Sequence, residues 1–93
     1  MIVNMRHEDW YYFIRIVEMI KAKPSVNITS TLFSDATETP VEKMYVVVNK
    51  MVEQNLIQYG KDDETLEITQ NGWESFEFQK GNFEHFKQMV NDG

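Results

Sequence analysis

The sequence predicts a small α+β domain, in which three helices precede a two-stranded antiparallel hairpin and a further helical segment follows it. Three observations predict this order: an apolar stripe at helical period near the N-terminus, a segment with helix start and stop residues at 39–57, and two short β-prone runs around a polar turn. With 93 residues the chain has enough length for one domain and a modest core. We therefore expect a single domain over residues 1–93.

The first predicted helix spans residues 7–21. Its apolar residues recur at helical period on one side, at Trp10, Phe13, Ile14, Val17 and Ile20. Tyr12, Ile16 and Met19 fall largely on the opposite side. A second apolar side means either deep burial or contact with a partner subunit. Because a chain this short has few elements to cover that side, we expect these three residues to lie in a homodimer interface.

Short elements follow Pro24, which ends the first helix. Residues 25–28 contain β-branched side chains and predict one brief strand. Thr29 or Ser30 is a suitable cap for a short helix of one or two turns that includes Phe33.

The central helix is predicted from a capped segment. Thr39 is a favoured N-cap residue, Pro40 suits the first helical position, and Glu42 lies three residues after the cap, as in a capping box. At the other end Asn55 tolerates the left-handed conformation, so that Leu56 can fold back on the last turn.

A helical wheel divides this helix into two faces. The buried stripe is predicted to contain Val41, Met44, Tyr45, Val48, Met51 and Val52. The outward face is predicted to contain Glu42, Lys43, Val46, Asn49, Lys50 and Glu53, with Val47 at its edge.

The hairpin is predicted from residues 56–59 and 66–69, which are separated by the turn-forming residues 60–65. Another helical segment starts near residue 73. A last helix is predicted after Asn82, with an apolar stripe at Phe83, Phe86 and Val90.

Two sequence patterns resemble those of the winged helix-turn-helix superfamily. Residues 50–57, K-M-V-E-Q-N-L-I, are similar to that family's pattern at the end of its third helix, with Asn55 in place of the usual glycine. Residues 66–72, L-E-I-T-Q-N-G, are similar to its pattern in the second strand of the wing. Small bacterial regulators of the MarR and PadR type are the nearest general match. The resemblance implies a core of three helices and a two-stranded wing over residues 7–79, with a C-terminal helical extension over residues 80–93.

The resemblance also implies a function. In that family the long third helix, here residues 40–54, enters the major groove of double-stranded DNA, and the wing lies along the backbone. Asn49 could contact an adenine edge and Val46 a thymine methyl group. The expected DNA-binding residues are Thr37, Thr39, Lys43, Val46, Asn49, Lys50 and Lys61. Family members commonly dimerise through helices outside the core, which fits Phe83, Phe86 and Val90.

Charge favours an alternative function. The chain has a net charge of −6, and the wing tip Lys61-Asp62-Asp63-Glu64 would be repelled by phosphates. The outward face of the central helix carries two cations and two anions, and it could equally be an ordinary solvent-exposed surface. The second hypothesis is therefore a winged-helix module for protein interaction or assembly, without DNA binding, in which the acidic wing and exposed Val46 and Val47 face a protein partner.

Other functional classes lack supporting residues. The chain has no cysteine and no glycine-rich phosphate loop, and no nucleophile–base arrangement is apparent. His7, Glu8 and Asp9 are consecutive and do not share a helix face, so we expect no metal site, no cofactor and no enzymatic activity. No signal peptide or run of about 18 apolar residues is present, which predicts a cytoplasmic protein without a membrane partner.

Overall fold

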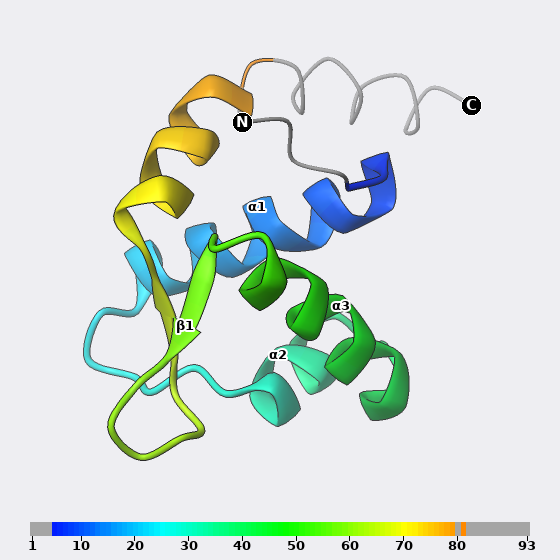
Figure 1. Ribbon diagram of the computed structural model, residues 1–93. Helices are drawn as coiled ribbons and strands as arrows, with labels where there is room; N and C mark the ends of the chain where they lie inside the picture. Colours follow the sequence, from blue (N-terminus) through cyan, green and yellow to red (C-terminus); the bar gives the residue numbers. More distant parts are fainter. Residues whose placement is uncertain (1–4, 80, 82–93) are drawn as a thin grey trace.

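The computed structural model describes residues 5–79 and 81, and they form a small α+β domain (Figure 1). The elements are α1 (His7–Ala22), α2 (Ser30–Ala36), α3 (Val41–Glu53), β1 (Ile57–Tyr59), β2 (Leu66–Ile68) and a helix over residues 70–79, here called the C-terminal helix. The predicted α+β class and element order are confirmed, and the arrangement is compatible with a winged helix. The extension predicted over residues 80–93, with Phe83, Phe86 and Val90, lies outside the described residues apart from residue 81.

Helix α1 is the central element of the core. Figure 1 shows α3 on one side of it and the C-terminal helix on another, with α2 below. Four of its apolar residues are buried, namely Phe13, Ile14, Ile16 and Val17. The apolar sides of α1 therefore pack against other parts of the same chain.

This packing corrects the predicted dimer face of α1. Ile16 is fully buried within the chain, so the prediction that it contacts a second subunit is wrong. Tyr12 is half-buried and makes an edge-to-face contact with Phe33, their ring centroids 6.2 Å apart. Met19 is also half-buried and packs against the core. The assumption that too few elements remained to cover this side was the error.

Helices α2 and α3 are joined by a tight turn. The Thr29 hydroxyl caps α2 by accepting a hydrogen bond from the Leu32 amide at 3.1 Å, as predicted. Helix α3 begins one residue later than predicted, with Pro40 rather than Thr39 at the N-cap and no capping side chain. The Thr39 hydroxyl instead lies 3.2 Å from that of Tyr12, so it joins α3 to α1.

The end of α3 is a Schellman motif, as the sequence predicts. The Leu56 amide donates to the Met51 carbonyl at 2.9 Å, and the Asn55 amide donates to the Val52 carbonyl at 3.0 Å. Asn55 has a φ of 61°, in the left-handed region. This motif turns the chain directly into β1.

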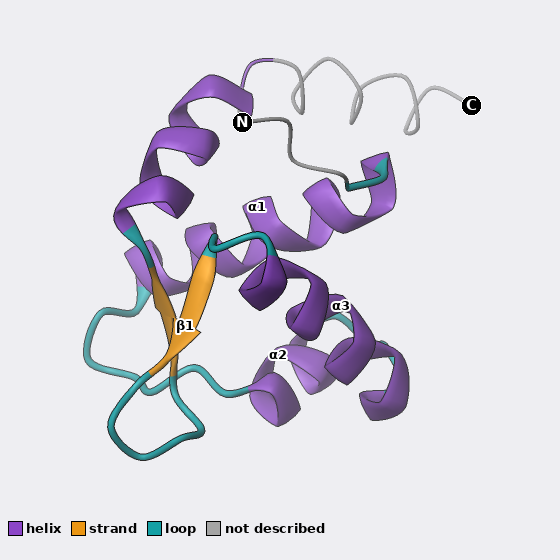
Figure 2. Ribbon diagram, viewed as in Figure 1, coloured by secondary structure: helices purple, strands orange, loops and turns teal. Residues whose placement is uncertain are grey.

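The two strands form an antiparallel ladder in which Ile57 lies opposite Ile68 (Figure 2). The strand predicted over residues 25–28 is reduced to an isolated bridge at the next residue, between Thr29 and Thr65. Beside it, the Leu66 amide donates to the Ile28 carbonyl at 2.7 Å. The segment before α2 is thus tied to β2, which leaves β1 at the open edge of the sheet.

Thr69 and Gly72 connect the hairpin to the C-terminal helix. The Thr69 hydroxyl donates to the Asn55 carbonyl at 2.6 Å and accepts from the Gly72 amide at 2.9 Å. A Cβ atom at Gly72 would lie 2.1 Å from the Leu56 carbonyl oxygen. The threonine and glycine of the I-T-Q-N-G sequence therefore hold the start of this helix against the end of α3.

Candidate interaction surface

Helix α3 is rotated about its axis relative to the predicted wheel. Its buried residues are Met44, Val47, Val48 and Met51. The prediction that Val47 is exposed at the edge of the outward face is wrong, because it is only 4% exposed, whereas Tyr45, predicted to be buried, is 49% exposed. The reason is tertiary: α1 covers the side of α3 on which Val47 lies.

The same rotation turns both lysines of α3 toward α1. Lys43 and Lys50 lie one turn before and one turn after Val47, beside the acidic first turn of α1. The Lys43 ammonium is 2.5 Å from the Glu8 carboxylate, and the Lys50 ammonium is 3.4 Å from that of Asp9. Lys43 is exposed, as predicted, whereas Lys50 is partly buried, and both lysines are paired with carboxylates of α1.

The surroundings of the two ion pairs differ. Lys43 also lies over the Tyr12 ring, 5.9 Å from its centroid, and its hydrogen bond to Glu8 raises the pKa of Lys43 above the usual value. Asp9 is nearly buried, and its carboxylate also accepts a hydrogen bond from the Arg6 amide at 3.2 Å. The negative charge of Asp9 is thus stabilised by the Arg6 amide at the start of α1 and by the Lys50 ammonium of α3.

The threonines expected to contact phosphate are engaged within the turn before α3. The Thr37 hydroxyl donates to the Phe33 carbonyl at 2.8 Å and lies 3.0 Å from the Thr39 hydroxyl. The Thr39 carbonyl in turn accepts from Ser34 at 2.5 Å. These hydroxyls stabilise the α2–α3 turn, and a phosphate would have to displace those bonds.

The exposed residues of α3 are Glu42, Lys43, Tyr45, Val46, Asn49 and Glu53. Lys43 pairs with Glu8 of α1, and the other five residues are here called the outer face. Val46 and Asn49 are exposed, as predicted, and Val46 has the highest exposed fraction of α3's large apolar side chains, at 57%. The only charged residues of this face are two glutamates. The outer face is therefore apolar and acidic.

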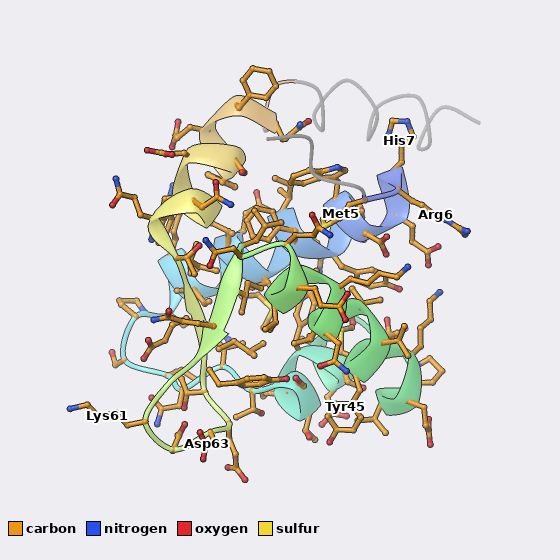
Figure 3. The ribbon with its side chains drawn as sticks, viewed as in Figure 1. Met5, Arg6, His7, Tyr45, Lys61 and Asp63 are labelled. Atoms are coloured by element: carbon orange, nitrogen blue, oxygen red, sulfur yellow. The ribbon has the colours of Figure 1, made fainter. Side chains whose placement is uncertain are left out.

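The hairpin loop, residues 60–65, is organised by Asp62. Its carboxylate accepts from the amides of Glu64 and Thr65 at 3.0 and 2.8 Å and from the Thr65 hydroxyl at 2.6 Å. These hydrogen bonds, the one from the Thr65 hydroxyl foremost, lower the pKa of Asp62 to about 2. Figure 3 shows Lys61 pointing away from the helices, whereas Asp63 lies on the side nearer to them.

A surface hollow of about 450 Å³ lies between the start of α2, the outer face and the hairpin loop. We call it the tyrosine hollow; it is lined by Thr29, Ser30, Thr31, Tyr45, Tyr59, Asp63 and Glu64. Neither tyrosine was predicted as a site residue. The wheel assigned Tyr45 to the core, and nothing in the sequence indicates that Tyr59 lines the same hollow, because Tyr45 lies on α3 and Tyr59 on β1.

The part of the chain described by the structure contains no group of three or more potential metal-ligating side chains. Within the same residues, no helix has the length and apolar composition needed to cross a membrane. Comparisons of the chain with models of protein families, with curated proteins and with solved structures find no match.

Proposed function

We propose that this protein is an interaction module with a winged-helix arrangement, whose outer face contacts another protein rather than DNA. The short helix before α3 and the hairpin directly after it support the winged-helix interpretation. The observation that carries the proposed function is the pairing of both α3 lysines with the carboxylates of α1.

Electrostatics argues against DNA at this surface. Affinity for DNA comes largely from cations that neutralise phosphates. Lys43 and Lys50 are already neutralised by Glu8 and Asp9. Lys61 is the one remaining lysine of the predicted DNA-binding set, and three carboxylates follow it in sequence. A phosphate backbone would be repelled by both the outer face and the hairpin loop.

The same surface suits a protein partner. Tyr45 and Val46 are adjacent and about half exposed, at 49% and 57%. Exposed aromatic and apolar side chains with a polar rim are typical of the centre of protein interfaces. Glu42 and Glu53 provide such a rim on α3.

DNA binding is tested by titrating mixed genomic duplex fragments with the native chain at low salt. We expect no retardation in a gel and no change in fluorescence anisotropy. Salt-dependent binding that is lost in the Lys43→Glu/Lys50→Glu variant would overturn the proposal and support a DNA-binding regulator.

Protein binding is tested by placing a photo-crosslinking amino acid at Val46 in cells that produce the chain. We expect protein adducts that resist nuclease. The matched control places the same amino acid at Glu18, an exposed position of α1. Nuclease-sensitive adducts at Val46, or the same adducts from both positions, would contradict the proposal.

A further inference from the structure

We infer that the tyrosine hollow binds an arginine or lysine side chain presented by an apolar segment of a partner protein. This inference rests on the proposed function, because it names the chemistry of the partner at that surface. It depends on the charge, the aromatic lining and the ordering of the hollow.

All the charge in the hollow is negative. Asp63 and Glu64 are its only ionisable acidic or basic side chains besides the tyrosines. Within residues 5–79 neither carboxylate has an ion-pair partner. The net charge of −6 adds to the same potential, so the hollow attracts cations and repels anions.

The tyrosines favour an organic cation over a metal ion. Tyr45 and Tyr59 are 49% and 38% exposed and both line the hollow. The face of a tyrosine ring attracts a guanidinium or ammonium group, while the carboxylates supply hydrogen-bond acceptors for its N–H groups. The volume of about 450 Å³ lies within the usual range for binding pockets.

The acidic side of the hollow is ordered before any partner arrives. The three hydrogen bonds of Asp62 fix the loop, and the Asp63 amide donates to the Gly60 carbonyl at 3.0 Å. Asp63 has a φ of 60°, which Asp tolerates better than most residues. Because the backbone is held, binding does not have to order the loop, which favours affinity.

Val46 is the reason for expecting an apolar residue in the partner segment. It follows Tyr45 in sequence and is 57% exposed on the outer face, the face from which Tyr45 also lines the hollow. A cationic side chain in the hollow would bring its neighbours in sequence onto this surface. A partner segment with an apolar residue next to arginine or lysine matches both features.

The inference is tested by NMR with the full ¹⁵N-labelled chain and the capped peptide Ala-Leu-Arg-Ala-Leu-Ala. We expect saturable amide shifts at Thr31, Tyr59 and Glu64 that weaken as salt is added. The matched peptide with Glu in place of Arg should leave these amides unchanged. Equal shifts with both peptides, or none with either, would overturn the inference.

The carboxylates are tested with Asp63→Asn/Glu64→Gln, in which asparagine retains tolerance of the left-handed backbone. We expect affinity for the arginine peptide to fall by roughly fivefold. The control Glu18→Gln/Glu74→Gln removes the same charge from exposed positions of α1 and the C-terminal helix and should bind like the native chain. Equal losses in both variants would mean that only net charge matters and would overturn the inference.

Arginine amide, as a free small cation, distinguishes a peptide site from a site for any amine. It should bind more weakly than the peptide, and equal binding would overturn the assignment of a protein segment. DNA binding by the native chain would defeat the proposed function, whereas indifference to arginine peptides would defeat only this inference.

Discussion

Gly72 lies where the C-terminal helix passes closest to the end of α3. Its hydrogen in place of a side chain leaves room for the Leu56 carbonyl oxygen, which would be 2.1 Å from a Cβ atom, and for the Ile68 side chain, which would be 2.8 Å away. Because the nearest atom belongs to the backbone, rotation of a side chain cannot relieve the contact. The glycine is required here by close approach, since its φ is not positive.

Replacing Gly72 with alanine is expected to destabilise the fold by about 1–3 kcal/mol, as overpacking typically does. Urea unfolding followed by circular dichroism measures this loss. Gly81→Ala is the matched control, because a Cβ atom there meets nothing within 4 Å. Equal stability of the Gly72→Ala variant and the native chain would contradict the close approach.

Asp62 gives the hairpin loop a pH dependence. Its pKa is lowered from 3.8 to about 2 in the folded chain. A lowered pKa means that the charged form stabilises the folded state above the unfolded value, and that this contribution is lost as the pH falls from about 4 to 2. The native chain should therefore exceed Asp62→Asn in stability at neutral pH, and the difference should shrink toward pH 2.

Urea unfolding of both proteins across this pH range measures the difference, and NMR titration of the carboxyl group gives the pKa directly. A titration midpoint for Asp62 near 3.8 would show that the loop hydrogen bonds do not stabilise its charged form.

At the scale of elements, the end of α3 and the start of the C-terminal helix form one joint. The Asn55 carbonyl, left free by the Schellman motif, accepts from the Thr69 hydroxyl, which also caps the following helix. The Asn71 amide group donates to the same carbonyl at 3.3 Å. One short segment thus ends α3, positions the hairpin and starts the next helix.

Thr69→Val should destabilise the protein by about 1–2 kcal/mol, because it removes a helix cap and leaves the Asn55 carbonyl with fewer donors. Thr69→Ser keeps the hydroxyl and should remain within a few tenths of a kcal/mol of the native chain. Thermal unfolding distinguishes the two variants. A serine variant as unstable as the valine variant would show that the methyl group, rather than the hydroxyl, stabilises the joint.

At the scale of the whole molecule, the ion pairs between α1 and α3 set the character of the surface. They join both lysines of α3 to α1, and the outer face contains no basic residue. The two pairs are not equivalent. The Asp9 side chain is 7% exposed, whereas the side chains of Lys43 and Glu8 are 49% and 54% exposed.

A double-mutant cycle of Asp9→Asn and Lys50→Met should give a coupling free energy of about 1 kcal/mol, because one partner is nearly buried. The corresponding cycle of Glu8→Gln and Lys43→Met should give a smaller coupling that disappears in high salt. Denaturant unfolding of the single and double variants measures both. A larger coupling for the exposed pair would contradict this order.

Local chemistry made much of the fold predictable from the sequence. The spacing of apolar residues along α1, the cap at Thr29 and the left-handed Asn55 each depend on neighbours within a few positions. The hairpin also forms from adjacent residues, and its predicted strands agree with β1 and β2 to within one residue at each end. Such features involve short-range sterics and hydrogen bonds, which the order of residues specifies directly.

The surface was decided by tertiary structure. A helical wheel gives the angles between residues but not which neighbour covers each side, so Tyr45 was assigned to the core and Val47 to the edge of the outward face. Whether Lys43 and Lys50 face solvent or α1 depends on contacts between residues some 35 to 41 positions apart. The Thr39–Ile57 segment by itself determines a helix that ends in a strand. The position of α1 determines which side chains that helix presents to a partner, because packing of the larger apolar surface fixes the rotation of α3.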